Sequence, residues 1–228
     1  MRQAEDDGRR AVDGDREQNR QAGPPPTGPP REEEQRRSQF AADGVGPLLQ
    51  RDYVLVIEGS RCTPEQVAQL LRSDFPRFSP AELARFTRSG DVTRPLDRGD
   101  TMHVLMVGMV ECGVRVIHLD RNSFTLGTLE GHPEAGRITF GAYRDAAGRL
   151  VCRIRSRARL RHHFYWYNYL FLGKHGQTRS WVVFLDRLAA ACGGRKLSEV
   201  VTSTDRVSET PADRGTEDAP TFTAGWMG

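Results

Sequence analysis

The chain has 228 residues, with 33 lysines and arginines against 30 aspartates and glutamates, and a formal net charge of +3. This charge balance is too small to indicate nucleic acid as the partner by itself. No run approaches the ~18 apolar residues that cross a membrane, and the N-terminus lacks the apolar core of a secretory signal peptide. We therefore expect a soluble cytoplasmic protein.

The composition predicts one domain between two tails. The hydrophobic share is 37%, and the deficit lies at the two ends. Residues 1–46 and 201–228 contain too few apolar side chains to offset the conformational entropy lost on folding. We predict disordered tails over 1–46 and 201–228, and a single domain over 47–200 that is large enough for one core. The cysteines show no metal-finger spacing and are expected to be reduced thiols: Cys62, Cys112, Cys152 and Cys192.

The predicted domain begins with a strand over 53–58, which Gly59 ends. Two helix starts of one design follow. Thr63-Pro64-Glu65-Gln66 places a capping threonine before proline, with glutamine at the third helical position, and predicts a helix to about Arg72. Ser79-Pro80-Ala81-Glu82 repeats this arrangement and predicts a second helix over 80–88.

Five further strands are predicted, over 102–111, 114–119, 124–129, 137–143 and 150–158. The separators are short, with Cys112-Gly113 the first of them, and short separators favour hairpins in an antiparallel meander. A last helix is predicted over 177–192, where apolar residues recur at helical spacing before Gly193-Gly194. The predicted fold is α+β, of helix-grip type: a curved antiparallel sheet of about six strands, two short helices after the first strand, and a long C-terminal helix packed on the sheet.

The loop between two of these strands, Thr128 to Gly136, holds the most constrained residues of the chain. Gly131 and Gly136 can adopt positive φ, while Pro133 fixes its own φ and keeps His132 out of the helical region. The loop therefore presents one imidazole and one carboxylate, His132 and Glu134, from a defined backbone. Two interpretations stay open: a shaped turn in which His132 bonds a neighbouring carbonyl, or a loop at the mouth of a pocket.

Arginine occupies every second position from 153 to 161, and smaller, mostly apolar residues stand between. Period two places all five arginines on one face of a strand. One interpretation is a solvated sheet face, in which the arginine stems cover apolar surface. The other is a basic stripe for an anion or a phosphate backbone. Nucleic-acid readers add interleaved aromatics or a recognition helix, and here the aromatics follow the stripe, which favours the solvated face.

The motif Phe124-Thr125-Leu126-Gly127-Thr128-Leu129-Glu130-Gly131-His132-Pro133-Glu134-Ala135-Gly136, followed by Phe140, resembles the core motif of the domain-of-unknown-function family numbered nineteen-ninety. That family occurs in bacteria, actinobacteria included, and in plants. The resemblance covers about residues 100–192 and implies a START-like, helix-grip domain without a settled activity. Three departures affect any shared site chemistry. Arg137-Ile138 stands where acidic residues usually follow the glycine, Ala158 replaces a proline, and Phe184 replaces a tyrosine.

The first functional hypothesis is a binding module that holds a small apolar or amphipathic molecule between sheet and last helix. Its candidate ligand-binding residues are Phe124, Thr128, His132, Glu134, Tyr143, Arg155, Trp166, Tyr169, Trp181 and Phe184. His132 and Arg155 would be polar anchors. Each aromatic side chain, taken alone, also fits an ordinary place in the core.

The second hypothesis is an enzyme that uses His132 and Glu134 as a general acid–base pair. No nucleophile motif, P-loop or dinucleotide fingerprint is present, and no cofactor is predicted. A metal site would need His118 and Asp120 beside His132, and no known ligand spacing supports it, so none is predicted. A third hypothesis makes the tails interaction segments of a scaffold.

Overall fold

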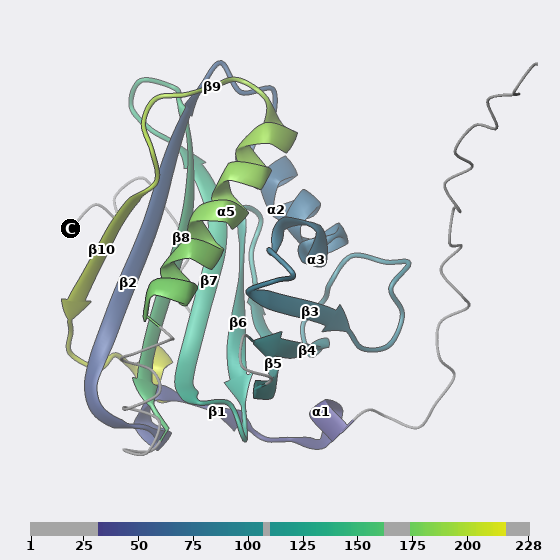
Figure 1. Cartoon of the computed structure of the whole chain (residues 1–228), viewed down its shortest axis with the longest axis vertical. Helices are drawn as coiled ribbons and strands as arrows, with labels where there is room; N and C mark the ends of the chain where they lie inside the picture. Colours follow the sequence, from purple (N-terminus) through teal and green to yellow (C-terminus); the bar gives the residue numbers. More distant parts are fainter. Residues whose placement is uncertain (1–31, 107–109, 162–173, 218–228) are drawn as a thin grey trace, which may run out of the picture.

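The computed structural model describes residues 32–106, 110–161 and 174–217 (Figure 1). Its main feature is one antiparallel sheet of ten strands rather than the predicted six. Eight strands form a continuous path in the order β10-β2-β8-β7-β6-β5-β4-β3, and two short strands, β1 and β9, pair with β6 and β2. Their bounds are β1 Ser38–Gln39, β2 Val45–Glu58, β3 Ala84–Arg88, β4 Thr101–Met106, β5 Val110–Leu119, β6 Ser123–Leu129, β7 Glu134–Arg144, β8 Leu150–Leu160, β9 Arg195–Lys196 and β10 Val201–Arg206.

The helices that contribute to the core lie against one face of this sheet, which we call the inner face; the opposite face is the outer face (Figure 1). They are α2 (Pro64–Ser73), α3 (Phe75–Phe78) and α5 (Lys174–Cys192). A single-turn helix, α1 (Glu32–Gln35), and two 3-10 turns, η1 (Ala41–Asp43) and η3 (Pro211–Asp213), complete the described elements. A curved antiparallel sheet that grips a long C-terminal helix is the predicted architecture.

Residues of α3, α5 and the sheet meet in an inner aromatic cluster, made of Phe75, Phe78, Phe86, Phe124, Phe140, Trp181 and Phe184. Phe140 lies at its centre, and its ring centroid is 5.0 Å from that of Phe75 and 5.4 Å from that of Trp181. Edge-to-face and tilted arrangements at these separations are the favourable ones for aromatic rings. The cluster fills the space between the sheet and the α2–α3–α5 layer.

The first predicted helix is confirmed in its start: the Thr63 side chain accepts from the Gln66 amide, and the Gln66 side chain accepts from the Thr63 amide. The second predicted helix, over 80–88, is wrong. After Pro80 the chain makes one turn, and residues 84–88 form β3 along the edge of β4. Strand alternation there buries Phe86 in the aromatic cluster, so tertiary packing overrides the local capping pattern.

The predicted turn at Cys112-Gly113 is also wrong. Both residues lie within β5, paired with Val104 and His103 of β4. The predicted strand over 102–111 is therefore two strands, β4 and the start of β5, and the residues between them, 107–109, lie outside the described part of the chain. Cys112 is completely buried in the core, which a turn position would not allow.

The predicted tail boundaries also need correction. β1 pairs with the end of β6, and residues 201–206 form β10, which pairs with residues 49–54 of β2. Residues 207–217, which we call the C-terminal strap, then cross the outer face, where η3 buries Ala212 and Asp213. A Cβ on Gly215 would lie 2.4 Å from the Phe40 ring, so the strap packs directly against the N-terminal segment.

Candidate functional site

The loop from Thr128 to Gly136 lies where the sheet splits between β6 and β7. Their pairing ends at Gly127 opposite Arg137, and β1 then takes the place beside Thr128 and Leu129. Gly136 allows this divergence, because it has φ 152° and a Cβ there would lie 2.2 Å from the Arg157 carbonyl oxygen. The predicted need for glycine at this position thus has a steric cause.

Thr128 holds the split together. Its Oγ1 accepts from the Gly136 amide at 3.0 Å and lies 3.0 Å from the Gln39 carbonyl oxygen, to which it donates. From the other side, the Gln39 side-chain amide donates to the carbonyl oxygens of His132 (3.1 Å) and Glu134 (2.9 Å). Thr128, a predicted ligand-binding residue, therefore connects three strands.

The His132 ring turns back onto its own loop. Its Nδ1 lies 3.0 Å from the amide nitrogen and 2.9 Å from the carbonyl oxygen of Glu134, and one ring nitrogen can serve only one of these at a time. Burial lowers the pKa of His132, while the nearby Glu134 carboxylate and the backbone contact act in the opposite direction. This is the geometry of the first interpretation, a shaped turn that His132 bonds internally.

The Glu134 carboxylate points elsewhere, toward Arg51 of β2. Glu134 Oε1 accepts from Arg51 Nη1 at 3.1 Å, and the two side chains are only 11% and 7% exposed. Arg51 shares the inner side of β2 with the core residues Tyr53 and Leu55, so this ion pair lies on the inner face. His132 and Glu134 therefore do not form the predicted acid–base pair through their side chains.

The ion pair has polar neighbours on the inner face. Arg51 is paired across the sheet with Ser156, and Ser156 with Ile138. Ser156 Oγ is buried without a hydrogen-bond partner among the described residues, and the same holds for Nε1 of Trp181 on α5. Tyr53, the next inner residue of β2, is 2% exposed, and burial raises the pKa of its hydroxyl. A leftover donor or acceptor of this kind costs about 1–3 kcal/mol unless something satisfies it.

The outer face carries the arginine stripe, and the prediction that it is a solvated face is wrong. Arg153, Arg155 and Arg157 are each only 8% exposed. Nε of both Arg153 and Arg155 donates to Asp52 Oδ1 of β2, at 2.8 and 2.7 Å. The stripe is therefore buried, and carboxylates cover it.

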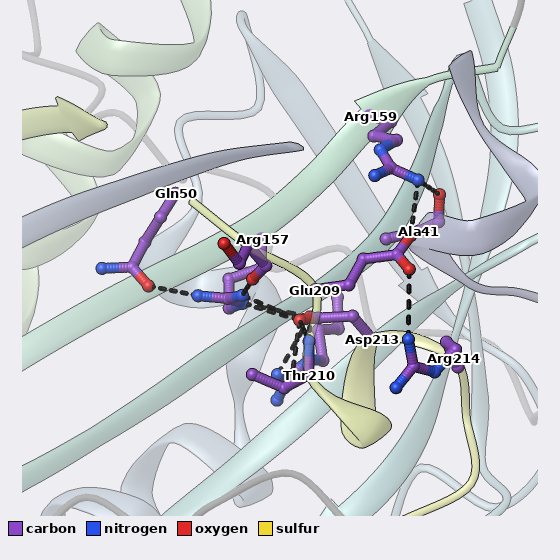
Figure 2. A network of polar contacts seen from close by, with 10 residues as sticks. Ala41, Gln50, Arg157, Arg159, Glu209, Thr210, Asp213 and Arg214 are labelled. Atoms are coloured by element: carbon purple, nitrogen blue, oxygen red, sulfur yellow. Dashed lines mark hydrogen bonds and ion pairs between the residues drawn. The ribbon is translucent and has the colours of Figure 1, made fainter. Parts of the chain in front are cut away.

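The strap supplies the other acids (Figure 2). Asp213, whose side chain is fully buried, accepts from Arg157 Nη2 at 2.8 Å and from Arg137 Nη2 at 3.0 Å. Arg159 Nη1 donates to Glu209 at 2.5 Å. Burial acts to raise the pKa of Asp213, but hydrogen bonds from Arg157 and Thr210 outweigh it and hold the pKa below its ordinary value of 3.8.

A family model described as a domain of unknown function (DUF1990) matches residues 65–180, half of the chain. The chain belongs to this family. None of the curated proteins matches it in sequence.

Solved structures of distant proteins are similar to the DUF1990 chain at low identity. Norcoclaurine synthase from Thalictrum flavum, in complex with dopamine and hydroxybenzaldehyde, has 12% identity and a TM-score of 0.46, over 77% of this chain and all of that one. The major latex-like protein 151 of Panax ginseng has 13% identity and a TM-score of 0.46, over 64% of this chain and 99% of that one. A protein of Chromobacterium violaceum has 14% identity and a TM-score of 0.43, over 63% and 96%.

The departures from the DUF1990 motif have visible structural roles. Arg137, in place of an acid, binds Asp213 of the strap. Ala158, in place of a proline, lies against Gly136. A Cβ added to Gly136 would lie 2.7 Å from the Cα of Ala158. Phe184, in place of a tyrosine, is completely buried among aromatic rings, where a hydroxyl would need a partner.

Apart from the loop residues Thr128, His132 and Glu134, the predicted ligand-binding residues separate into three groups. Phe124, Trp181 and Phe184 meet in the inner aromatic cluster. Tyr143 and Arg155 lie on the outer face, because Ala142 and Ile154 beside them face the core, so their prediction as inner lining residues is wrong. Trp166 and Tyr169 lie outside the described residues. The sequence analysis did not predict Arg51 as a site residue. The alternation of side chains along a strand would have placed it on the same face as Tyr53, Leu55 and Ile57.

Within the ranges that the structure describes, no three or more His, Cys, Asp and Glu side chains are placed to hold a metal ion. His118 and Asp120 of the metal alternative lie at and just after the end of β5, on a different element from His132. None of the described helices is long and apolar enough to cross a membrane.

Proposed function

We propose that the domain binds a small amphipathic molecule on the inner face of the sheet. The polar group of the molecule would lie at Arg51 and Glu134, and its apolar part would lie against the edge of the aromatic cluster. This keeps the predicted class of ligand and one predicted site residue, Glu134, and replaces the predicted polar anchors His132 and Arg155 by Arg51.

The buried ion pair of Arg51 and Glu134 supports this proposal above other observations. Removing two charges from water costs more than their attraction returns unless further hydrogen bonds satisfy them, so a buried pair is a poor device for stability alone. Beside it, the Ser156 hydroxyl has no hydrogen-bond partner in the described residues. A ligand hydroxyl, carbonyl or carboxylate placed there would satisfy a group that the fold leaves unsatisfied.

The apolar part of the proposed site follows from the next inner residues. Ile138, which pairs with Ser156, is partly exposed although it packs against the core. Trp181 belongs to the aromatic cluster and Tyr53 to the surrounding core, and both carry a polar atom on a ring. Pockets for small molecules usually combine such apolar walls with a few convergent polar groups.

The experiment compares Ser156→Leu with Ser203→Leu, the same change at an exposed position of β10. Denaturing extraction and mass spectrometry would identify a small molecule that co-purifies with the wild type, and titration with the uncharged dye Nile red would measure binding directly. We expect Ser156→Leu to lose the co-purifying molecule and to weaken dye binding about tenfold or more, because it replaces the hydroxyl beside Arg51 by a bulkier apolar group.

Circular dichroism provides the folding control for both variants. Absence of any co-purifying molecule, together with dye binding that Ser156→Leu leaves unchanged, would contradict the proposal. The acid–base alternative has less support, because His132 contacts the backbone of Glu134 rather than its carboxylate. The residues that would carry the scaffold alternative, 1–31 and 218–228, lie outside the described part of the chain.

A further inference from the structure

A pocket lies on the outer face, on the other side of the sheet from the proposed ligand site. It has a volume of about 250 Å³ and lies between β5, the loop before β4 and the strap. Three arginines line it from separate elements: Arg98, Arg115 and Arg137. One carboxylate, Glu217 at the end of the described chain, lines it as well.

Backbone pairing fixes the positions of these arginines. The Gly99 amide donates to the Val116 carbonyl at 2.8 Å and the Val116 amide to the Asp100 carbonyl at 2.9 Å, which places Arg98 beside β5. Arg115 is paired with Gly127, and Gly127 with Arg137, so both arginines lie in one row on the outer face. The Ile117 side chain lies over Gly127, 3.0 Å from the position that a Cβ there would take, and it therefore separates the two arginines.

Arg137 has a donor left over. Its Nε and Nη2 both donate to Asp213 Oδ1, at 3.1 and 3.0 Å. Nη1 makes no hydrogen bond to any described residue, although the side chain is only 6% exposed. The Asp213 clamp fixes the plane of the guanidinium, so this remaining nitrogen is held in place before any ligand arrives.

The remaining wall of the pocket is apolar. Phe40, Ile117 and Ala212 contribute to it, and Phe40 is itself held flat against Gly215 of the strap. The pocket is smaller than the roughly 300–1,000 Å³ typical of drug-sized ligands, so it suits a molecule of one ring or a short chain. Cationic nitrogens opposite an apolar wall recognise an anion that carries an apolar group.

We propose that this outer pocket binds a small organic anion, a carboxylate or a phosphate monoester with an apolar group, held by Arg137 together with Arg98. Arg115 adds positive charge to the wall, but its guanidinium already donates to Ser38 Oγ and to the carbonyl oxygens of Glu34 and Arg36. Because Ala212 and Gly215 belong to the strap, the ligand would contact both the sheet and the strap. Its binding would therefore favour the docked strap over the detached one, by the linkage that holds for any ligand that binds one state only.

The test uses isothermal titration calorimetry to measure the binding of four compounds to the full-length chain: benzoate, phenyl phosphate, inorganic phosphate and uncharged benzyl alcohol. We expect benzoate, phenyl phosphate or both to bind, and the stronger of them identifies the anionic group. Inorganic phosphate should bind at least about tenfold more weakly, because it lacks the apolar contact, and benzyl alcohol should not bind measurably.

Two pocket variants and one control decide the location. Arg98→Gln removes one exposed cation, and Ala212→Leu fills the apolar wall; each should weaken aromatic-anion binding about tenfold. Arg121→Gln removes an arginine that is 82% exposed and pairs with Glu65, and should bind as the wild type does. The proposal is overturned if neither aromatic anion binds, if inorganic phosphate binds as tightly as they do, or if both pocket variants bind like the control.

Discussion

The two faces of the sheet are buried by different physical means. On the inner face, Phe140 and its neighbours exclude water by packing aromatic rings at centroid separations of 5.0 to 5.5 Å. On the outer face, guanidinium groups are buried and two aspartates, Asp52 and Asp213, neutralise them. Apolar burial is insensitive to pH and directionless, whereas the ionic layer depends on ionisation and on the position of each oxygen. The aromatic cluster of the inner face should therefore resist acid, and the ionic layer of the outer face should not.

The strongest test of the inner face is Phe140→Ala. Phe140 is completely buried and contacts four other aromatic rings, so its loss should lower the free energy of unfolding by about 3–5 kcal/mol. Urea unfolding followed by fluorescence measures the change. Val201→Ala, at a position 62% exposed on β10, is the control and should change stability by less than about 0.5 kcal/mol. A loss below about 1 kcal/mol at Phe140 would show that the cluster is loosely packed.

On the outer face the corresponding change is Asp213→Ala. It leaves Arg137 and Arg157 buried without their shared carboxylate, and breaking a buried pair in this way costs about 3–5 kcal/mol where the fold cannot relax. Here the strap can detach, so we expect a smaller loss, about 2–3 kcal/mol. Asp205→Ala, at an exposed position of β10, is the matched control.

Amide hydrogen exchange separates the two faces in this variant. In Asp213→Ala we expect residues 207–217 to exchange rapidly while the amides of β7 and β8 stay protected. Uniform loss of protection across the sheet would show instead that the strap and the sheet unfold together.

Acidification should act on the same layer. The pKa values of Asp52 and Asp213 are both held below their ordinary value of 3.8, because hydrogen bonds from arginines outweigh the effect of burial. Their contribution is therefore fully present above that value and is lost as pH falls through the lower folded-state pKa. We expect strap protection, corrected for intrinsic exchange rates, to fall between about pH 4 and pH 2.5, while the inner core stays protected. Equal losses on both faces would contradict this difference.

The smallest expected effect concerns His132. Burial lowers its pKa from the ordinary 6.5, so its contribution is present above pH 6.5 and is lost as pH falls through the folded-state pKa. His132→Asn can keep a hydrogen bond to the Glu134 backbone but does not titrate. The wild type should lose stability between about pH 6.5 and pH 5 that the variant does not lose, by less than the cost of Asp213→Ala. Parallel stability curves would show that His132 does not titrate in this range.

Local sequence patterns were sufficient to predict the structure where residues close in sequence determine it. Thr63 and Gln66 form the predicted capping box, and the strands on both sides of Gly131–Gly136 lie where period-two alternation placed them. They were insufficient at Ser79-Pro80-Ala81-Glu82, because the pairing of β3 with β4 is a contact between distant segments. The sequence indicated a constrained loop that carries His132 and Glu134. It did not indicate the partners of this loop, Gln39 and Arg51, which lie more than 80 residues away in sequence.

The strap shows the same limit in another form. Residues 201–217 are polar and charged, a composition typical of disorder. Two of their carboxylates, Glu209 and Asp213, meet guanidinium groups that other strands hold in place, and composition alone does not record such complementarity. The regular spacing of arginines on β8 was the one available sign that acidic residues elsewhere in the chain would be needed to bury it.

The contact between Phe40 and Gly215 brings two points 175 positions apart in the sequence into direct touch. A short glycine-rich connector could join the chain there, and the exposed turn at Asp145–Gly148 offers a place for new ends. Such a circular permutant would keep the eight-strand path of the sheet, although not the short β1, while converting the strap from a terminal arm into an internal loop. Comparing its unfolding with that of the natural order would measure how much of the strap's attachment depends on having a free end.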